Sequence, residues 1–463
     1  MKHIRILIIV FVVICTSCDK KNEPLQKETI SGSILNHKEK VLTLYDFLGK
    51  SQWEQQIEVK DGVFKINLEI NQPTIKSFAY GNNLPKDIFL LPNKTASVSF
   101  DANDFENSFR LKGDLEVENS ILDSISSKLL NLDYKYVYTE SLENSIIYLD
   151  SLELNSKEIL RNLLSNNKTV ANFENFATAC IEYNTAYLKL DIAGRKDQHP
   201  KDYYDFLNNL SFTEPYLLEV FYYRMFLQSY IEKETKSRIQ KLDSLQKQDS
   251  DFKFKESLKV IAQLEHDEIR AYSLYNAMML SLMDSGVNEF EKYYDYFKRN
   301  NKDQHYEEQL QLAISENKKI EPGKLAPEIA ITDINGKEFL LSNFQGKYVY
   351  LDFWATTCPY CIKETDSYVQ LYSDYGTNEI EFVSISADLD ENRWKNYVEE
   401  HKNVGSILRV ENSWDSKAFQ SYQINSSPTY VLIDREGKII DPVAPRPSSK
   451  EIRETFDKLL STK

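Results

Sequence analysis

Apolar and polar residues alternate along the first part of the chain, over residues 28–117. In "IEVKDGVFKINLEI" the apolar residues fall on every second position on both sides of Asp61 and Gly62. This period is typical of half-buried strands, and Asp-Gly between two such runs is a strong signal for a hairpin. "ISGSIL", "KVLTLY" and "TASVSFD" add further short strands. The pattern therefore predicts a small antiparallel β-sandwich.

The apolar spacing becomes helical over residues 118–315. "PYLLEVFYYRMFLQSYIEKE" and "KVIAQLEHDEIRAYSLYNAMMLSLM" carry apolar residues at steps of three and four, which indicates amphipathic helices. The charged run "EHDE" at 265–268 fits a solvent-exposed helix face. Cys180 lies among apolar residues in "NFATACIEYN", which indicates a thiol buried in the core. This central region is predicted to be all-α.

Strands and helices alternate in the last part, residues 324–463, after a polar linker at 316–323 that Pro322 and Gly323 interrupt. Strands are expected at "KYVYLDFW", "EIEFVSISA" and "TYVLID", with helices between them. Ser448 and Glu451 have the spacing of a capping box at the start of a final helix. This order predicts an α/β domain with a mixed sheet. The fold class is thus multidomain: an N-terminal β-sandwich, a central all-α region and a C-terminal α/β domain.

The N-terminus has the features of an export signal. Lys2 and Arg5 precede an apolar run at 6–14, which is too short to span the roughly 30 Å of a bilayer as a helix. Residues 1–17 are therefore predicted to be a signal peptide, and residues 18–27 a tether. "VICTSC" resembles a bacterial lipobox, which implies that Cys18 is lipidated and becomes the mature N-terminus. An ordinary secretory signal with incidental cysteines is the alternative.

The composition excludes several classes of function. The formal net charge is −15, whereas nucleic-acid binding requires clustered Lys and Arg. The sequence contains no glycine-rich phosphate loop, and no histidine stands at metal-ligand spacing to another His or Cys. We therefore expect no cofactor, no metal and no nucleic-acid partner.

Cys358 and Cys361 form a C-x-x-C pair in "FWATTCPYC". A strand leads into the pair and a helix is predicted to begin at it, where free backbone N–H groups and the helix dipole lower the pKa of a thiol. Cys358 would then be the nucleophile, and Cys361 would resolve the mixed disulfide. A zinc site needs two further ligands, and a c-type haem needs His where Ile362 stands. A redox-active disulfide is the favoured interpretation, with an inert clip or a metal half-site as alternatives.

The C-terminal part resembles a known family. "APEIAITDINGKEFLLSNFQGKYVYLDFWATTCPYCIKE" followed by "SSPTYVLIDREGKII" is similar to the thioredoxin superfamily and, within it, to the TlpA/ResA-like thiol-disulfide oxidoreductases. The N-terminal strand pattern looks like the β-domain of bacterial envelope lipoproteins that end in such a domain. The resemblance implies an envelope enzyme of a Gram-negative-type bacterium, anchored by its lipid, with the thioredoxin-like domain facing the periplasm.

The resemblance also implies roles for individual residues. Asp352 matches the buried acid beneath the cysteines, and Glu364 matches the acid of the C-x-x-C-x-x-E pattern; either could exchange a proton with Cys361. Pro428 matches the cis-proline that faces the cysteines, where the backbone of Ser427 could pair with an extended substrate. The alternatives are a solvent-facing strand edge for Asp352, an exposed helix position for Glu364 and an ordinary trans bond for Pro428.

Five residues are predicted to contact the substrate: Pro428, Ser427, Trp354, Pro359 and Tyr360. Three positions depart from the family pattern. Thr357 stands where most relatives carry Trp, Asn425 where Gly is common, and Asp366 where a proline often kinks the helix. The missing Trp leaves the usual docking surface for partners in doubt.

The predicted function is a thiol-disulfide oxidoreductase that acts as a reductase. Its expected partners are disulfide-bearing or thiol proteins of the envelope and a membrane electron donor. One alternative is a peroxiredoxin-like peroxidase, to which "TTC" offers a Thr beside the first cysteine. Another is a binding or scaffolding lipoprotein whose redox domain is accessory.

Overall fold

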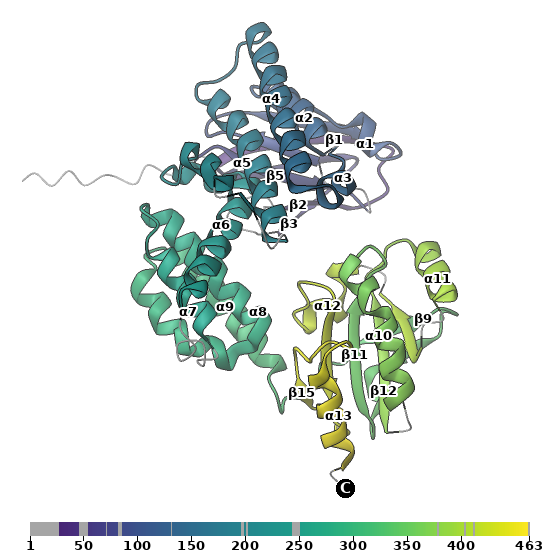
Figure 1. Ribbon diagram of the computed structural model, residues 1–463. Coiled ribbons are helices and arrows are strands. Elements are labelled where there is room, and N and C mark those ends of the chain that lie inside the picture. Colours follow the sequence, from purple (N-terminus) through teal and green to yellow (C-terminus); the bar gives the residue numbers. More distant parts are fainter. Residues whose placement is uncertain are drawn as a thin grey trace, which may run out of the picture. The chain divides into compact units, whose positions relative to one another are not determined.

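The computed structural model (Figure 1) describes residues 27–45, 54–70, 72–81, 86–130, 132–195, 199–200, 202–242, 251–376, 379–401, 404–410 and 413–461. The predicted signal peptide and Cys18 lie outside the described residues. The chain divides into two compact units, one made of residues up to 124 with 165–171, the other of 125–164 with 172 onward. None of the described helices combines the length and the apolar character that crossing a membrane requires.

The N-terminal part is a sandwich of two four-stranded sheets, with strand orders β4-β1-β7-β8 and β3-β2-β5-β6. The alternating positions Phe64, Ile66 and Leu68 are buried in their shared core, which confirms the predicted sandwich. One pair, β1 with β7, runs parallel. The elements are β1 (Lys27–Leu35), β2 (Val41–Tyr45), β3 (Glu54–Glu58), β4 (Val63–Glu69), β5 (Thr74–Ala79), β6 (Lys86–Leu90), β7 (Ala96–Asp101), α1 (Phe105–Ser108) and β8 (Arg110–Gly113).

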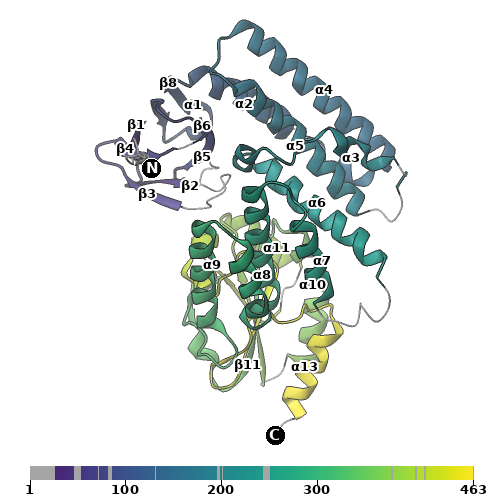
Figure 2. The same cartoon turned by 90° about the vertical axis from the view of Figure 1, so that its left-hand side faces the viewer.

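The central region is helical, as predicted. Its elements are α2 (Glu116–Leu130), α3 (Tyr134–Thr139), α4 (Leu142–Asn166), α5 (Phe173–Gly194), α6 (Phe221–Gln240), α7 (Phe252–Ile261), α8 (Asp267–Asn300) and α9 (Gln304–Asn317), with 3₁₀ helices at Tyr203–Asn209 and Pro215–Glu219. α6 packs on α5 and α7, and α8 packs on α7 and α9 (Figure 2). Cys180 is a free, half-buried thiol on α5, and desolvation raises its pKa to about 12.

The charged run at 265–268 spans a break between two helices, so the predicted solvent-exposed helix face is found only for its second half. Asp267 and Glu268 are exposed on α8, whereas Glu265 and His266 precede that helix. The chain breaks after α7, and α8 begins at Asp267 with His266 as its N-cap, whose Nδ1 accepts from the N–H of Glu268 at 3.2 Å. Asp267 and Glu268 thus occupy the first turn, where the helix dipole favours negative charge. The helical spacing of apolar residues continues across this break, so the sequence pattern predicted helix there as well.

The C-terminal part contains a seven-stranded mixed sheet in the order β10-β9-β13-β12-β11-β14-β15. Its elements are β9 (Ala330–Asp333), β10 (Glu338–Leu340), β11 (Tyr348–Trp354), α10 (Pro359–Tyr375), β12 (Ile380–Ser386), α11 (Glu391–Glu400), β13 (Ser406–Arg409), α12 (Lys417–Ser421), β14 (Thr429–Ile433), β15 (Ile439–Asp441) and α13 (Lys450–Ser461), with 3₁₀ helices at Leu341–Phe344 and Ser413–Asp415. This arrangement confirms the predicted α/β domain. In the expected linker, α9 continues into a 3₁₀ helix at Lys318–Ile320, and Ile320 is buried in the core of this domain.

β11 sits in the middle of this sheet, and its side chains alternate between two cores. Leu351 and Phe353 join the core on one face, whereas Tyr350 joins the core on the other face together with residues of α10 and α13. Because side chains along a strand alternate between the two faces, Asp352 shares its face with Tyr350 and Trp354. This places a carboxyl group directly beneath α10.

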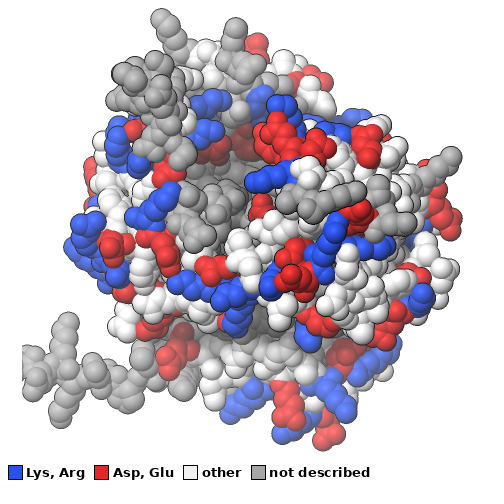
Figure 3. Space-filling model, turned by 90° about the horizontal axis from the view of Figure 1, so that it is seen from below, with Lys and Arg blue, Asp and Glu red and all other residues white. Residues whose placement is uncertain are grey.

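The surface carries both signs of charge. Lys and Arg side chains lie interspersed with Asp and Glu on the face shown in Figure 3.

Candidate active site

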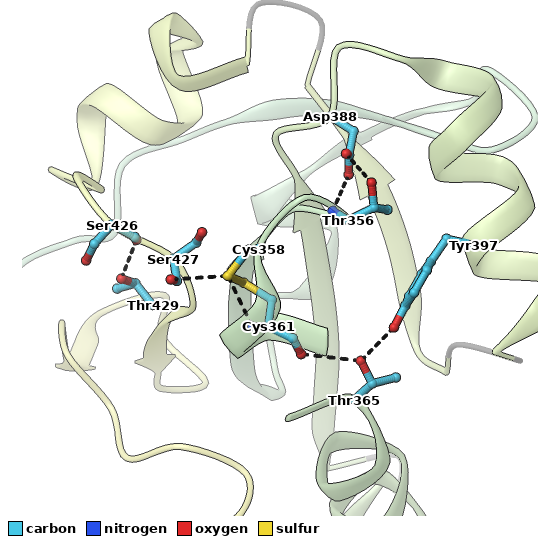
Figure 4. Close-up of a disulfide and its surroundings, with 9 residues drawn as sticks. All are labelled: Thr356, Cys358, Cys361, Thr365, Asp388, Tyr397, Ser426, Ser427 and Thr429. Atoms are coloured by element: carbon cyan, nitrogen blue, oxygen red, sulfur yellow. Dashed lines mark hydrogen bonds between the residues drawn. A yellow bond between two sulfur atoms is a disulfide. The ribbon is translucent and has the colours of Figure 1, made fainter. Parts of the chain in front are cut away.

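The two cysteines lie where β11 gives way to α10 (Figure 4). Cys358 is the N-cap of α10, Pro359 is its first residue, and Sγ of Cys358 accepts from the N–H of Cys361 at 3.1 Å. The two cysteines form a disulfide. Cys358 is half-buried, whereas Cys361 is only 5% exposed. This geometry fits the predicted nucleophile at the helix start, with the resolving thiol further from solvent.

The loop before β14 faces the disulfide. The Ser427–Pro428 peptide bond is cis, as the resemblance implied. Sγ of Cys358 lies 3.4 Å from the carbonyl oxygen of Ser427, which is a contact in the disulfide because no thiol proton is present. Ser427 is half-buried and Pro428 is buried. The backbone of Ser427 is therefore next to the sulfur that a substrate must reach.

Asp352 is buried and 8% exposed, so it is not on a solvent-facing strand edge. Its Oδ1 has no hydrogen-bond partner among the described residues. Burial raises the pKa of Asp352 to about 8, the nearby charge of Glu364 adds to this shift, and a hydrogen bond from Ser384 opposes it. A carboxyl group with this pKa can gain or lose a proton near neutral pH.

Glu364 is also buried, at 7% exposed, which excludes the exposed position considered from the sequence. Its two carboxylate oxygens accept from the backbone N–H of Ser448 at 3.1 Å and from the Ser448 hydroxyl at 2.9 Å. The predicted capping box is therefore wrong, because Ser448 binds Glu364. Ser449 caps α13 instead, accepting from the N–H of Ile452 at 3.3 Å.

A small cavity of about 20 Å³ joins the acids to the resolving cysteine. Asp352, Cys361, Glu364, Ser384 and Tyr430 are among its lining residues. A space of this size holds about one water molecule. The structure thus brings together the three groups that the sequence proposed for proton transfer, along one face of β11 and the buried side of α10.

A hydrogen-bonded group around Asp388 was not found from the sequence. This carboxylate accepts from Thr356 through the backbone N–H at 2.8 Å and the hydroxyl at 2.5 Å (Figure 4). It also accepts from the Ser386 hydroxyl at 2.6 Å. β11 and β12 run parallel, so the residues that follow them lie at the same edge of the sheet. Asp388 therefore fixes the turn that presents Cys358. A polar residue just after the apolar strand "EFVSISA" was the available signal.

The predicted substrate-contacting residues fall into two groups. Pro359 and Tyr360 are exposed beside the disulfide, as is Thr357. Trp354 is only 4% exposed and lies beneath the surface, and its contact with a substrate stays a prediction. Its ring packs near that of Tyr397, whose hydroxyl lies 3.0 Å from the Thr365 hydroxyl. Trp354 supports the buried side of the site.

The described residues contain no group of three or more His, Cys, Asp or Glu side chains that could hold a metal ion. A C-x-x-C pair at the start of a helix, a cis-proline opposite it and buried acids behind it define a thioredoxin-like redox site. The chemistry that such a site supports is reversible exchange between thiols and a disulfide.

Comparison with known proteins agrees with this class. The model of the AhpC/TSA family matches residues 322–441. The thiol-disulfide oxidoreductase ResA of Bacillus cereus is 30% identical over 145 residues, which cover 31% of this chain and 82% of that protein. ResA of Bacillus subtilis is 31% identical over 124 residues, covering 27% of this chain and 68% of that protein. The solved thioredoxin domain of a thiol-disulfide oxidoreductase from Bacteroides vulgatus is 30% identical, covers 30% of this chain and 97% of its own, and gives a TM-score of 0.28.

Through its C-terminal domain, the chain belongs to the family of the thiol-disulfide oxidoreductase ResA. It is therefore a thiol-disulfide oxidoreductase, and the predicted enzyme class is confirmed. The β-sandwich and the helical region lie outside the residues that the family model matches.

Proposed function

We propose that this enzyme reduces disulfide bonds in proteins of the bacterial envelope, with Cys358 as the nucleophile and Cys361 as the resolving residue. The observation that carries the proposal is the different exposure of the two sulfurs: Cys358 is reachable beside the backbone of Ser427, whereas Cys361 faces the buried cavity with Asp352 and Glu364. An exposed nucleophile with a protected partner is what disulfide exchange with a protein requires.

In the proposed cycle, the reduced enzyme transfers two electrons to the substrate. The Cys358 thiolate attacks one substrate sulfur, the substrate disulfide breaks, and a mixed disulfide forms while the first substrate thiolate leaves and takes up a proton from solvent. Cys361 then loses its proton and attacks Sγ of Cys358. The mixed disulfide breaks, the second substrate thiolate leaves, and the enzyme holds the Cys358–Cys361 disulfide. A dithiol protein donor at the membrane must reduce it for the next cycle.

The cavity acids serve the second step. Cys361 is 5% exposed, so bulk water is a poor acceptor for its proton. Asp352 in its ionised form can accept that proton, and Glu364 lines the same cavity. Because the pKa of Asp352 is about 8, both of its protonation states are populated near neutral pH, which suits a group that accepts and then releases a proton.

Turnover of insulin disulfides with a dithiol donor tests the proposal. We expect Cys358→Ser to abolish the reaction, because no nucleophile remains. Cys361→Ser should stop after the first step and accumulate mixed disulfides, which migrate as covalent adducts on non-reducing gels. Full activity of Cys358→Ser, or turnover of hydrogen peroxide that exceeds turnover of insulin, would contradict the proposed reaction.

We propose further that the mature chain is anchored to an envelope membrane through a lipid on Cys18, with the thioredoxin-like domain in the periplasm. The support is the sequence "VICTSC" after a short apolar run. Incorporation of an alkyne fatty acid in cells tests this proposal. Cys18→Ser should abolish labelling, whereas Cys15→Ser, the matched control three residues earlier, should keep it. Labelling that survives Cys18→Ser would refute the anchor.

A further inference from the structure

Three loops meet at the edge of the sheet that carries Cys358. They follow β11, β12 and β13, which run parallel, so their carboxyl ends lie at one edge. Asp388 in the second loop accepts from Thr356 in the first at 2.8 Å, and the Ser413 hydroxyl in the third donates to the carbonyl of Ala387 at 2.7 Å. These hydrogen bonds join the three loops beside the nucleophile.

Two large apolar side chains project from these loops. Leu389 directly follows Asp388 and is 51% exposed, and Trp414 directly follows Ser413 and is 40% exposed. The indole packs edge-on against Phe419 at 5.2 Å between ring centroids, and Phe419 packs edge-on against Phe353 of β11 at 5.1 Å. Trp414 is therefore held in place by the domain core while much of its ring faces solvent.

The core beneath Trp414 also supports the nucleophile. Cys358 packs against the cluster of buried residues that contains Phe353, Ala387 and Phe419. Trp414 thus rests on the same core as Cys358, and Leu389 follows Asp388, which is hydrogen-bonded to Thr356 in the loop that leads to Cys358. The Ser427 loop contacts Cys358 through its carbonyl oxygen at 3.4 Å, and it leads into β14, the neighbour of β11 on the side opposite β12.

We propose that Leu389 and Trp414 form a docking surface for a large apolar side chain that neighbours the reacting cysteine of a protein substrate. The inference rests on the proposed reduction of protein disulfides. A substrate sulfur must approach Sγ of Cys358 to within about 3–3.5 Å before exchange. The residues that flank this sulfur in the substrate are then brought over the surrounding loops. An apolar side chain next to the substrate cysteine contributes favourably to the binding free energy when it covers the indole and the leucine side chain, whereas a polar side chain does not.

Two synthetic peptide disulfides test this surface. Each is a symmetric dimer of a short, equally charged peptide, with leucine on both sides of the cysteine in one and serine in the other. We expect the wild-type enzyme to reduce the leucine peptide with a kcat/KM about tenfold higher, equivalent to about 1.4 kcal/mol. In Trp414→Ala this ratio should fall towards one, and Trp414→Phe should restore most of it.

Leu325→Ala provides the matched control. Leu325 is 70% exposed in the same domain and lies next to Lys438 of the β14–β15 turn, away from the three loops. This variant should keep both the rates and the ratio. Equal rates for the two peptides in the wild type, or an unchanged ratio in Trp414→Ala, would overturn the docking surface while leaving the reductase intact. Failure of the wild type to reduce either peptide would instead refute the proposed function.

Discussion

Buried ionisable side chains occur in both the helical region and the thioredoxin-like domain. They form ion pairs in the helical region but, among the residues that the structure describes, not beneath the disulfide. In the helical region, Lys189 is buried and lies 2.7 Å from Asp150 and 3.6 Å from Glu153. Lys157 bridges Glu153 at 2.8 Å and Glu182 at 2.7 Å. Beneath the disulfide, neither Asp352 nor Glu364 forms an ion pair among the described residues.

The consequence appears in the pKa values of one carboxyl group from each region, Glu153 and Asp352. Burial by itself would raise the pKa of Glu153, but hydrogen bonds from Lys157 and Thr185 and the charge of Lys189 outweigh it, so the pKa is lowered. For Asp352 burial prevails and the pKa rises to about 8. Pairing with a cation keeps a buried carboxylate ionised, so that it serves to stabilise the fold. The absence of such a cation among the described residues of the active site leaves Asp352 with a pKa near the pH at which the enzyme acts.

Asp352→Asn should produce the largest effect. The variant lacks the carboxyl group proposed to accept the proton of Cys361 and keeps only Glu364 in the cavity, so we expect the rate of insulin reduction at pH 7 to fall about 100-fold. In contrast to the rate, the free energy of unfolding at pH 8 should be raised by the substitution, because Asn carries no proton to lose. A folded pKa of about 8 against 3.8 means that the wild type loses stability as pH rises from 4 to 8, by at most on the order of 5 kcal/mol.

Urea unfolding of the oxidised protein at pH 4.5 and pH 8 measures this loss. The wild type should be less stable at pH 8 than at pH 4.5, because folding retains a proton that the unfolded chain releases. Asp352→Asn should show a smaller difference between the two pH values. A wild type and variant with parallel pH dependence would show that Asp352 is ionised throughout and that the contrast with Glu153 is mistaken.

Lys189→Met should separate stability from chemistry in the helical region. It removes the cation between Asp150 and Glu153, and we expect the free energy of unfolding to fall by about 1–3 kcal/mol. The rate of insulin reduction by the folded protein should not change. Lys450→Ala removes an exposed pair with Glu454 and should cost less than about 0.5 kcal/mol. A Lys189→Met variant as stable as Lys450→Ala would mean that the buried pairs contribute little.

Ser448 and Ser449 offer the finest test, because the two neighbours have different partners. Ser448→Ala removes the hydroxyl that binds Glu364, at a cost of about 0.5–1.5 kcal/mol, and should slow insulin reduction because Glu364 is held less firmly in the cavity beside Cys361. Ser449→Ala removes the cap of α13 and should cost about 1 kcal/mol of stability with an unaltered rate of insulin reduction by the folded protein. Equal rates in the two variants would show that the Ser448 hydroxyl does not position Glu364 for the reaction.

Much of the fold could be predicted from local patterns. Alternation around Asp61 and Gly62 predicted strands of the sandwich, and the strand that leads into Cys358 predicted a thiol at a helix start. Other expectations failed where periodicity cannot distinguish alternatives. The run at 265–268 fits a helical period, yet the chain ends one helix and starts another there. Ser448 has capping-box spacing, but Glu364, distant in the sequence, competes for its hydroxyl.

The sequence by itself determined which chemistry is available: two cysteines at C-x-x-C spacing, a carboxyl group within an apolar strand and a proline before the next strand. These are properties of composition and short-range spacing. Only the tertiary structure decided which groups meet. It buried Trp354, placed Asp388 against Thr356, and set Trp414 at the sheet edge that carries Cys358. These relations depend on strand order and on helices packing over the sheet, and such long-range contacts leave no periodic signal along the chain.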